Sequence, residues 1–408
     1  MKVTLLVWGL LFLPDSVQSF LSPGVHRAAA MNLPGKTRLT STSSGAIQPV
    51  RRSLQASSSV VKKPASRLMV NLLTATSTFG ASSIIKSLPI LGTLVVAGLL
   101  AARLPGVIAR GWRSYNKEEN SVGREYDAWT REKILEHYWG EHIHLGYYTE
   151  EDQKAGYLKK NFIGAKYDFI DRMMAFAKLD GQTFKPAKVL DVGCGIGGTT
   201  RYIAKKLGTT SQVSGITLSQ EQVRRAKELA EEQDVTNAEF QVMDALHMSY
   251  PDNSFDLVWA CESGEHMPDK KAYVEEMVRV LKPGGTLVIA CWCQRDAKAF
   301  PLSRSEQKRV DFMCTEWSHP YFISIQDFER LALGTGVMEN VRTEDWAKFT
   351  LPSWRHSVWV GVFDPFFWML RPHLWVKILR DAFTLNVFHN AFKDGLMGYG
   401  MIYAQKKK

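Results

Sequence analysis

The stretch VLDVGCGIGGTTRYIAKKLG, residues 189–208, decides the fold. Its apolar start is typical of a buried strand, closely spaced glycines follow, and a helical pattern ends it. Gly193, Gly195 and Gly198 lack a Cβ, so the backbone can turn tightly and approach a ligand closely. This order of strand, glycine loop and helix predicts a nucleoside-binding loop at the carboxyl end of a strand.

Strand and helix patterns alternate along the chain from Ala187 onward. Helical stretches separate the strand candidates; in residues 220–233, Val223, Ala226 and Ala230 share one apolar face. This alternation predicts an α/β fold with a parallel, doubly wound sheet. The expected strands are Lys188–Val192, Gln212–Ile216, Ala238–Val242, Phe255–Ala260 and Thr286–Cys293.

The residue before the glycines indicates which cofactor the loop holds. Asp191 and Gly197 extend the pattern to D-x-G-x-G-x-G, which resembles the first motif of class I S-adenosylmethionine-dependent methyltransferases, a Rossmann-like family. The resemblance implies that Asp191 faces the methionine ammonium and that the loop with Gly193, Cys194 and Gly195 passes the carboxyl tail. A nicotinamide cofactor is disfavoured, because its anionic pyrophosphate would be repelled by a carboxylate at this place.

The end of the second strand lacks the acid that usually meets the ribose. Thr217, Leu218, Ser219 and Gln222 form a T-L-S-x-x-Q pattern, which resembles a sub-branch in which the amide of the glutamine reaches the ribose hydroxyls. An amide offers both a donor and an acceptor, so it can replace a carboxylate. The alternative is that Gln222 lies on a solvated helix face.

Two further stretches resemble the same family. QVMDALHMSYPDNSFDLVWA, residues 241–260, places Asp244 after the third strand, where the family's acid contacts the adenine amino group and the next amide, Ala245, meets the ring. RVLKPGGTLVIA, residues 279–290, resembles the family's turn before the fifth strand. The resemblance therefore implies S-adenosyl-L-methionine as the cofactor.

Three other stretches indicate the branch of the family. YWGEHIHLGYY (138–148), ESGEHMPDK (262–270) and SHPYFISIQDF (318–328) resemble the C-methyltransferases of vitamin E and plastoquinone biosynthesis, a likeness that runs from Ser121 to the C-terminus. It implies methylation of a prenylated quinol of the 2-methyl-6-phytyl-1,4-benzoquinol type. The alternatives are a γ-tocopherol methyltransferase, another small-molecule or lipid methyltransferase, and a non-catalytic lipid-binding relative.

Ring methylation benefits from a base near the acceptor hydroxyl. His266 is the first candidate and Glu262 the second, because both follow the fourth strand at its carboxyl end. An N-terminal helical flap is expected to contact the cofactor or the acceptor through Trp139, His142, His144, Tyr147 and Tyr148. No metal is expected, because His142 and His144 lack further ligands at a suitable spacing.

The N-terminal part has the composition of a targeting leader. Residues 1–19 have the layout of a signal peptide, and residues 20–70 are basic, acid-free and rich in Ser and Thr like a transit peptide. Together they resemble bipartite plastid leaders; the alternative is a secretory signal followed by a disordered basic arm. Residues 84–112 are expected to form a membrane-associated helix or, alternatively, a buried one.

The remaining residues, 118–408, are expected to form the methyltransferase domain, with a cofactor core at 187–295 and a helical, aromatic substrate region at 296–408. The overall net charge of +10 belongs to the leader, since residues 16–117 contain 13 basic residues and no acid. A slightly acidic domain argues against a nucleic-acid partner. Residues 346–375 contain nine Phe and Trp residues, of which about half are expected to be core and the rest to face a prenyl tail or a bilayer.

Overall fold

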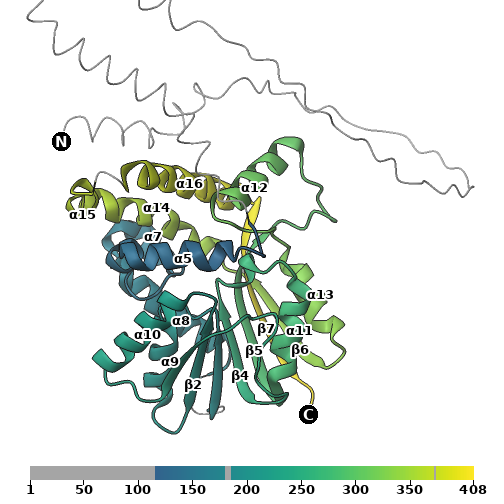
Figure 1. The fold of residues 1–408 in the computed structure, drawn as a ribbon. Coiled ribbons are helices and arrows are strands. Elements are labelled where there is room, and N and C mark those ends of the chain that lie inside the picture. Colours follow the sequence, from purple (N-terminus) through teal and green to yellow (C-terminus); the bar gives the residue numbers. More distant parts are fainter. Residues whose placement is uncertain (1–114, 180–184, 372–373) are drawn as a thin grey trace, which may run out of the picture. The chain divides into compact units, whose positions relative to one another are not determined.

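The computed structural model describes residues 115–179, 185–371 and 374–408 (Figure 1). The expected signal peptide, transit-like segment and membrane-associated helix, at 1–19, 20–70 and 84–112, lie outside these ranges, and their predictions stand as made. Within the described ranges, no helix combines the length and the apolar character that crossing a membrane requires.

A seven-stranded sheet forms the centre of the described domain, in the order β3-β2-β1-β4-β5-β7-β6. The first five strands run parallel, as expected, because each is joined to the next by a crossover segment. β5 starts at Leu281, five residues earlier than expected. The strands are β1 (Lys188–Val192), β2 (Gln212–Thr217), β3 (Ala238–Val242), β4 (Phe255–Cys261), β5 (Leu281–Gln294), β6 (Met338–Asp345) and β7 (Met397–Lys406).

The last two strands are an addition to the expected sheet. β7 runs antiparallel to both of its neighbours, β5 and β6, so the sheet is mixed. Both strands come from residues 296–408, which were expected to form a helical substrate region. This part of the chain therefore completes the sheet as well as contributing helices.

Helices cover both faces of the sheet. On one face lie α8 (Phe162–Phe176), α9 (Gly198–Leu207) and α10 (Gln220–Glu232), while α11 (Lys270–Val280) and α13 (Ile325–Gly334) cover the other (Figure 1). Val189 and Leu190, adjacent on β1, are fully buried in the cores of opposite faces. A strand buried on both sides explains why its sequence is continuously apolar.

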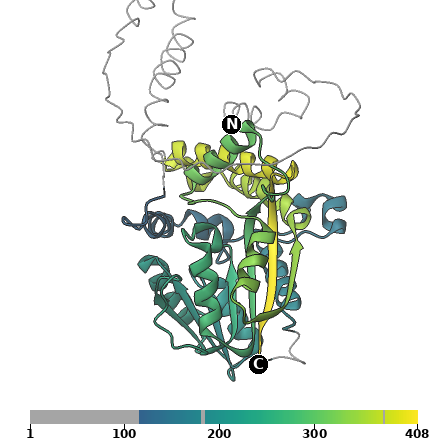
Figure 2. The ribbon, with the colours of Figure 1, turned by 90° about the vertical axis from the view of Figure 1, so that its right-hand side faces the viewer.

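A further group of helices gathers beyond the carboxyl ends of the parallel strands. Figures 1 and 2 show them stacked above the sheet. Because ligands bind at this edge of a parallel sheet, these helices surround the expected site. They are α5 (Ser121–Glu132), α6 (Ile134–Trp139), α7 (Glu150–Ala155), α12 (Arg304–Glu316), α14 (Ala347–Phe363), α15 (Phe366–Met369) and α16 (Trp375–Lys393).

Candidate active site

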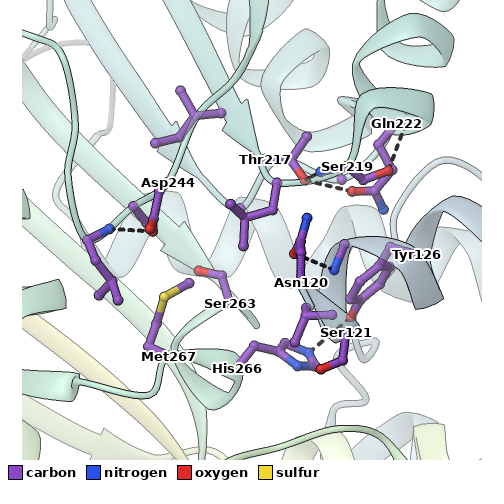
Figure 3. A pocket seen from close by; sticks show the side chains of 18 of the residues that line it. Asn120, Ser121, Tyr126, Thr217, Ser219, Gln222, Asp244, Ser263, His266 and Met267 are labelled. Atoms are coloured by element: carbon purple, nitrogen blue, oxygen red, sulfur yellow. Dashed lines mark hydrogen bonds between the residues drawn. The ribbon is translucent and has the colours of Figure 1, made fainter. Parts of the chain in front are cut away.

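A cavity of about 370 Å³ lies at the carboxyl ends of β1, β2 and β4, with α5 as its outer wall (Figure 3). Most of the residues expected to bind the cofactor or to act as a base meet here, although they come from four separate loops. The expected residues that line it are Gly193, Gly195, Thr217, Leu218, Gln222, Asp244, Ala245, Glu262 and His266.

A smaller cavity of about 30 Å³ shares Gly193 and Gly195 with the main one and is lined by Asp191 and Cys194. Asp191 is only 2% exposed, and its Oδ2 accepts a hydrogen bond of 2.6 Å from the Thr200 hydroxyl. Burial raises the pKa of Asp191 to about 7. A buried carboxyl without a cationic partner fits the ammonium group of S-adenosylmethionine, which would restore the missing charge.

The glycine loop leaves room for a ligand at one position in particular. Gly193 and Gly197 have positive φ angles of 89° and 78°, and a Cβ at either would lie within 2.4 Å of Ser263 or Phe240. At Gly195 a Cβ would meet only the Gln222 Nε2, at 3.9 Å. The loop is therefore packed at its ends and open in its middle, as a backbone that carries a ligand must be.

Gln222 points into the cavity beside Thr217 (Figure 3). The Thr217 hydroxyl donates to Gln222 Oε1 at 2.8 Å, and the Ser219 hydroxyl accepts from the Gln222 backbone N–H at 3.1 Å. Gln222 is 2% exposed, so the alternative of a solvated helix face is wrong. With its oxygen engaged, the amide keeps its Nε2 donors for a ligand hydroxyl.

Asp244 lies on the opposite side of the cavity from Gln222, after β3 (Figure 3), and the next residue, Ala245, also lines the cavity. Asp244 Oδ1 accepts a hydrogen bond of 2.9 Å from the Leu246 backbone N–H. This bond fixes the carboxylate against its own loop and leaves Oδ2 for an amino group of a ligand. The two sides of the cavity thus carry the residues that the resemblance assigns to the ribose and to the adenine, respectively.

Helix α5 is fastened over the cofactor loops by a contact that the sequence did not indicate. The Ser219 hydroxyl donates to Asp127 Oδ1 at 2.5 Å, and the backbone N–H of Glu221 donates to the same oxygen at 3.2 Å. Asp127 thereby caps the first turn of α10 from outside, where a negative charge is favoured. We call this contact the α5 latch.

Glu262 ends β4 with a left-handed backbone, at a φ of 48°. Its Oε1 accepts from the Leu145 backbone N–H at 2.8 Å and from the Tyr399 hydroxyl at 2.7 Å. Burial, and then the charge of Glu265, raise the pKa of Glu262 to about 8. A strained backbone that aims a carboxyl into a cavity is common at functional sites.

His266 ends a short 3₁₀ turn, Gly264–His266, and both of its ring nitrogens have partners. The Tyr126 hydroxyl lies 3.1 Å from Nε2, and His319 Nδ1 lies 3.2 Å from Nδ1. Burial, and then the charge of Lys270, lower the pKa of His266 to about 3. His266 is therefore neutral at physiological pH, and its pKa lies below that of Glu262 in this conformation.

Lys270 holds the turn that carries His266. Its Nζ is buried and donates to the backbone carbonyls of Gly264, Glu265 and Met267 at 2.7, 2.9 and 2.8 Å. A single ammonium group thus satisfies three carbonyls of the turn that would otherwise lack a partner. These three bonds hold the turn in place and so help to fix the position of His266.

The residues expected to contact a ligand from the flap lie differently. Trp139 packs edge-on against Phe162, Tyr147 stacks on Phe349, and the Tyr148 hydroxyl bonds to His356. These three side chains do not line either cavity, so in this conformation they support the flap from behind. The reason is that residues 145–148 lie in the protein core, where the rings of Tyr147 and Tyr148 pack against other side chains and away from water.

The two flap histidines are also buried. His142 Nδ1 lies 3.3 Å from the Thr199 hydroxyl, whereas His144 lines the smaller cavity beside Asp191. Ile143, between them, reaches the main cavity. Among the described residues, no group of three or more potential ligands could hold a metal ion.

The two partners of the His266 ring were missed by the sequence analysis. Tyr126 and His319 lie 140 and 53 residues from His266 in the chain. His319 belongs to SHPYFISIQDF, a stretch that resembles the family, and Tyr126 lies within the region of likeness that starts at Ser121, but nothing in the spacing relates either residue to His266. Only the fold brings them together.

Known proteins similar to this chain agree with the geometry of the site. Residues 190–289 match a family described as a methyltransferase domain. The 2-methyl-6-phytyl-1,4-hydroquinone methyltransferase of Synechocystis is 43% identical, over 78% of this chain and 96% of its own. The chloroplastic tocopherol O-methyltransferase of Arabidopsis thaliana is 36% identical, over 67% of this chain and 78% of its own.

Solved structures show the same fold at lower identity. A putative sarcosine dimethylglycine methyltransferase from Galdieria sulphuraria has a TM-score of 0.60 at 20% identity and covers 69% of this chain and 98% of its own. A geranyl diphosphate C-methyltransferase from Streptomyces coelicolor, solved with S-adenosyl-L-homocysteine, has a TM-score of 0.55 at 20% identity, over 71% and 98%. The glycine loop and the buried carboxyl of Asp191 agree with these relatives. The chain therefore belongs to the phytylquinol and tocopherol methyltransferase family of class I S-adenosylmethionine-dependent enzymes.

Proposed function

We propose that this enzyme transfers a methyl group from S-adenosylmethionine to a ring carbon of a prenylated quinol of the 2-methyl-6-phytyl-1,4-benzoquinol type. The observation that carries the proposal is the wall of the main cavity, where Glu262 and the Tyr126–His266 pair lie beside the cofactor loops. The relative from Synechocystis, which is named for this acceptor, supports the choice of substrate.

The cofactor supplies an electrophilic methyl group, so the work of the protein is to align the acceptor, exclude water and move a proton. A phenol ring carbon becomes nucleophilic when its hydroxyl gives up a proton. Glu262, with a pKa of about 8, is the group that accepts this proton most readily in its ionised form. It is held in place by Leu145 and Tyr399.

His266 orients the acceptor together with Tyr126. The two are hydrogen-bonded, and burial, followed by the charges of Glu265 and Glu262, raises the pKa of Tyr126, so Tyr126, His266 and Glu262 share one electrostatic environment. A quinol has hydroxyls at both ends of its ring. One hydroxyl therefore meets Glu262 and the other meets the Tyr126–His266 pair.

The acceptor is tested by supplying the purified enzyme with labelled cofactor and detergent-dispersed quinols or tocopherols. Turnover should favour 2-methyl-6-phytyl-1,4-benzoquinol over γ-tocopherol by at least about tenfold, which corresponds to roughly 1.4 kcal/mol. The reason is that γ-tocopherol has one oxygen locked in its second ring and cannot use both contacts. A preference for γ-tocopherol would assign the chain to the activity that the name of the Arabidopsis relative suggests.

The proton acceptor is tested with Glu262→Gln and His266→Asn, and with His247→Asn, an exposed histidine, as the matched control. In the wild type, kcat/KM should rise with pH up to about 8 as Glu262 ionises. Glu262→Gln should lower kcat by a factor of 100 or more and flatten this rise. His266→Asn should lower kcat and raise KM for the quinol, whereas full activity of Glu262→Gln would return the role of base to His266.

We also infer that the enzyme works in a plastid at a membrane, because its leader resembles bipartite plastid leaders and two tocopherol methyltransferase relatives are named chloroplastic. A reporter fused to residues 1–70 should enter the plastid, and Phe20→Ala should divert it. Secretion of the unaltered fusion would contradict this localisation.

A further inference from the structure

Large apolar side chains are exposed together on one side of the helices that cover the site. Of the 14 exposed large hydrophobic residues in the described ranges, eight lie between positions 363 and 383, which shows that they are not scattered. We call this set the apolar patch. Its members are Phe363, Phe366, Met369, Leu370, Trp375, Val376, Leu379 and Phe383.

Helix α16 is apolar on opposite faces. Trp375, Leu379 and Phe383 recur every four residues and are 41–48% exposed. Phe388 and Phe392, farther along the helix, pack into the core against Trp354. A helix with two apolar faces requires a non-aqueous neighbour for each of them, and the core supplies only one.

Two of the cationic side chains beside the patch are paired with acids within the protein. Lys377 pairs with Glu132 at 2.5 Å, and Arg380 pairs with Glu316 at 2.5 Å. Arg371 lies over the Phe367 ring at 3.9 Å. The patch therefore offers apolar area and little net charge, which suits hydrocarbon better than a nucleic acid or a charged protein surface.

The patch is connected to the wall of the active-site cavity. Trp129 packs against Tyr126 at 5.3 Å, and the Lys377 ammonium lies 5.7 Å from the centre of the Trp129 ring. Lys377 stands between Val376 and Leu379 on α16. These two contacts place α16, which carries part of the patch, close to the acceptor side of the cavity.

The size of the cavity shows that a long hydrocarbon chain needs space elsewhere. About 370 Å³ is at the lower end of the range for a small-molecule site, and a bound cofactor would take up part of it. An acceptor ring can fit beside the cofactor, but its prenyl chain must leave the cavity. A chain that left through water would lose a favourable contribution for each methylene group.

We propose that the apolar patch docks the enzyme on the surface of a lipid bilayer, so that a prenylated acceptor reaches the cavity without crossing water. The proposal rests on the proposed function for its biological purpose. The described part begins at Tyr115, just after the segment 84–112, for which the sequence analysis predicts membrane association, and a membrane-associated segment at that point of the chain would tether the domain close to a bilayer. Aromatic side chains such as those of Trp375 and Phe366 suit the interfacial region of a bilayer.

The first experiment locates the surface directly in the full chain. An environment-sensitive fluorophore is attached to Leu370→Cys, in the patch, and to Phe300→Cys, which is 66% exposed outside it; the unsubstituted chain measures background labelling of native cysteines. Vesicles of phosphatidylcholine, which carry no net charge, should shift the emission at position 370 to shorter wavelength and leave position 300 unchanged. The shift should persist in 1 M salt, since apolar contact is not screened.

Other occupants give different results, each of which overturns the proposal. A blue-shifted emission at position 370 that depends on protein concentration and not on vesicles indicates a second copy of the chain. An emission that is blue-shifted from the start and insensitive to both indicates that another segment of the chain covers the patch. Equal shifts at positions 370 and 300 indicate non-specific adsorption.

The second experiment measures the strength of docking. Phe366→Glu combined with Leu370→Glu should weaken vesicle binding at least tenfold, whereas Phe300→Glu combined with Leu333→Glu, also at exposed apolar positions, should not. Cofactor binding and circular dichroism should remain unchanged, because none of these side chains is buried. Binding is measured on vesicles without any quinol, so a failure here is distinct from a failure of the proposed methyl transfer. Unchanged binding of the patch variant would refute the proposal.

Discussion

At the scale of single residues, the ionised carboxylate of Asp191 is destabilised by burial, and a bound ammonium group would remove this destabilisation. In the protein without cofactor its carboxyl is buried, with one hydroxyl donor and a pKa raised from 3.8 to about 7. Because the folded state favours the neutral form, Asp191 contributes its full share to the stability of the fold below about pH 4. That stability is lost as the pH rises through about 7. An arriving ammonium group reverses the preference.

Replacement of this carboxyl separates binding from folding. Asp191→Asn should abolish measurable cofactor binding by isothermal titration, because the ammonium loses its charged partner. The same variant should have a higher Tm than the wild type at pH 8 and an equal Tm at pH 4, where both side chains are neutral. The wild type should bind the cofactor more tightly as the pH rises from 5 to 7. Retained affinity in the variant would remove Asp191 from the site.

Gln222 and Thr217 stand where many related folds have a single acid that binds the ribose hydroxyls. Gln222→Ala should weaken cofactor binding by roughly 1 kcal/mol, the usual contribution of a hydrogen bond. Thr217→Val is the matched control, since it removes the 2.8 Å bond to Gln222 Oε1 and leaves the Nε2 donors in place. Its effect should be smaller. If the two variants bind the cofactor as the wild type does, ribose contacts lie elsewhere.

At the scale of secondary-structure elements, α5 acts as the wall that closes the site. It contacts α10 through the α5 latch, and it carries Tyr126 at the acceptor side. Both capping residues of the helix have left-handed backbones: the N-cap, Asn120, has a φ of 46°, and the C-cap, Lys133, has a φ of 56°. The helix is therefore a short rigid piece between two sharp bends.

Loss of the latch should speed release of the cofactor. Asp127→Ala removes the acceptor of the Ser219 and Glu221 bonds, so α5 is held less firmly over the loops. Stopped-flow measurement should show cofactor dissociation at least about fivefold faster, as expected for the loss of a charge-assisted bond. The control is Asp364→Ala, which loses only the bond between the exposed side chains of Asp364 and His137. Equal dissociation rates in the two variants would mean that α5 is not a closing wall.

The elements that the sequence predicts well are those with strong local signals. β1, β4 and the part of β5 from Thr286 onward are apolar runs that follow polar or glycine-rich turns, and α10 has a clear amphipathic face, so the pattern alone locates them. β7 was missed because MGYGMIYAQK, with two glycines among aromatics, has weak strand propensity. Its position comes from pairing with β5 and β6, which are distant in sequence.

The same distinction applies to the site. Asp191 and the glycine loop are contiguous and form a motif, whereas the contacts of Glu262 come from Leu145 and Tyr399, more than 100 residues away on either side. Basicity depends on such distant neighbours through burial and nearby charge. For this reason the sequence could propose Glu262 and His266 as bases, but it could not rank their pKa values.

At the scale of the whole molecule, the end of the chain lies inside the sheet. β7 is hydrogen-bonded between β5 and β6, and most of its residues are buried. Removal of residues 395–408 should therefore prevent folding, as judged by the loss of a cooperative thermal transition. Removal of only Lys407 and Lys408, which are exposed, should leave Tm within a few degrees of the wild type. A folded protein without β7 would show that the parallel strands are stable by themselves.

The same strand also connects the sheet to the chemistry of the site. Tyr399, in β7, donates its hydroxyl to Glu262 Oε1 at 2.7 Å and so helps to hold the pKa of Glu262 from rising further. Tyr399→Phe keeps the buried ring but removes this donor, so the ionised carboxylate is less stabilised. The rise of kcat/KM with pH should move above pH 8, while the affinity for the cofactor stays unchanged. Tyr403→Phe, four residues along the same strand, is the control and should leave the profile in place. An unmoved profile in Tyr399→Phe would mean that Glu262 does not set the pH dependence, and that the proton passes to another group.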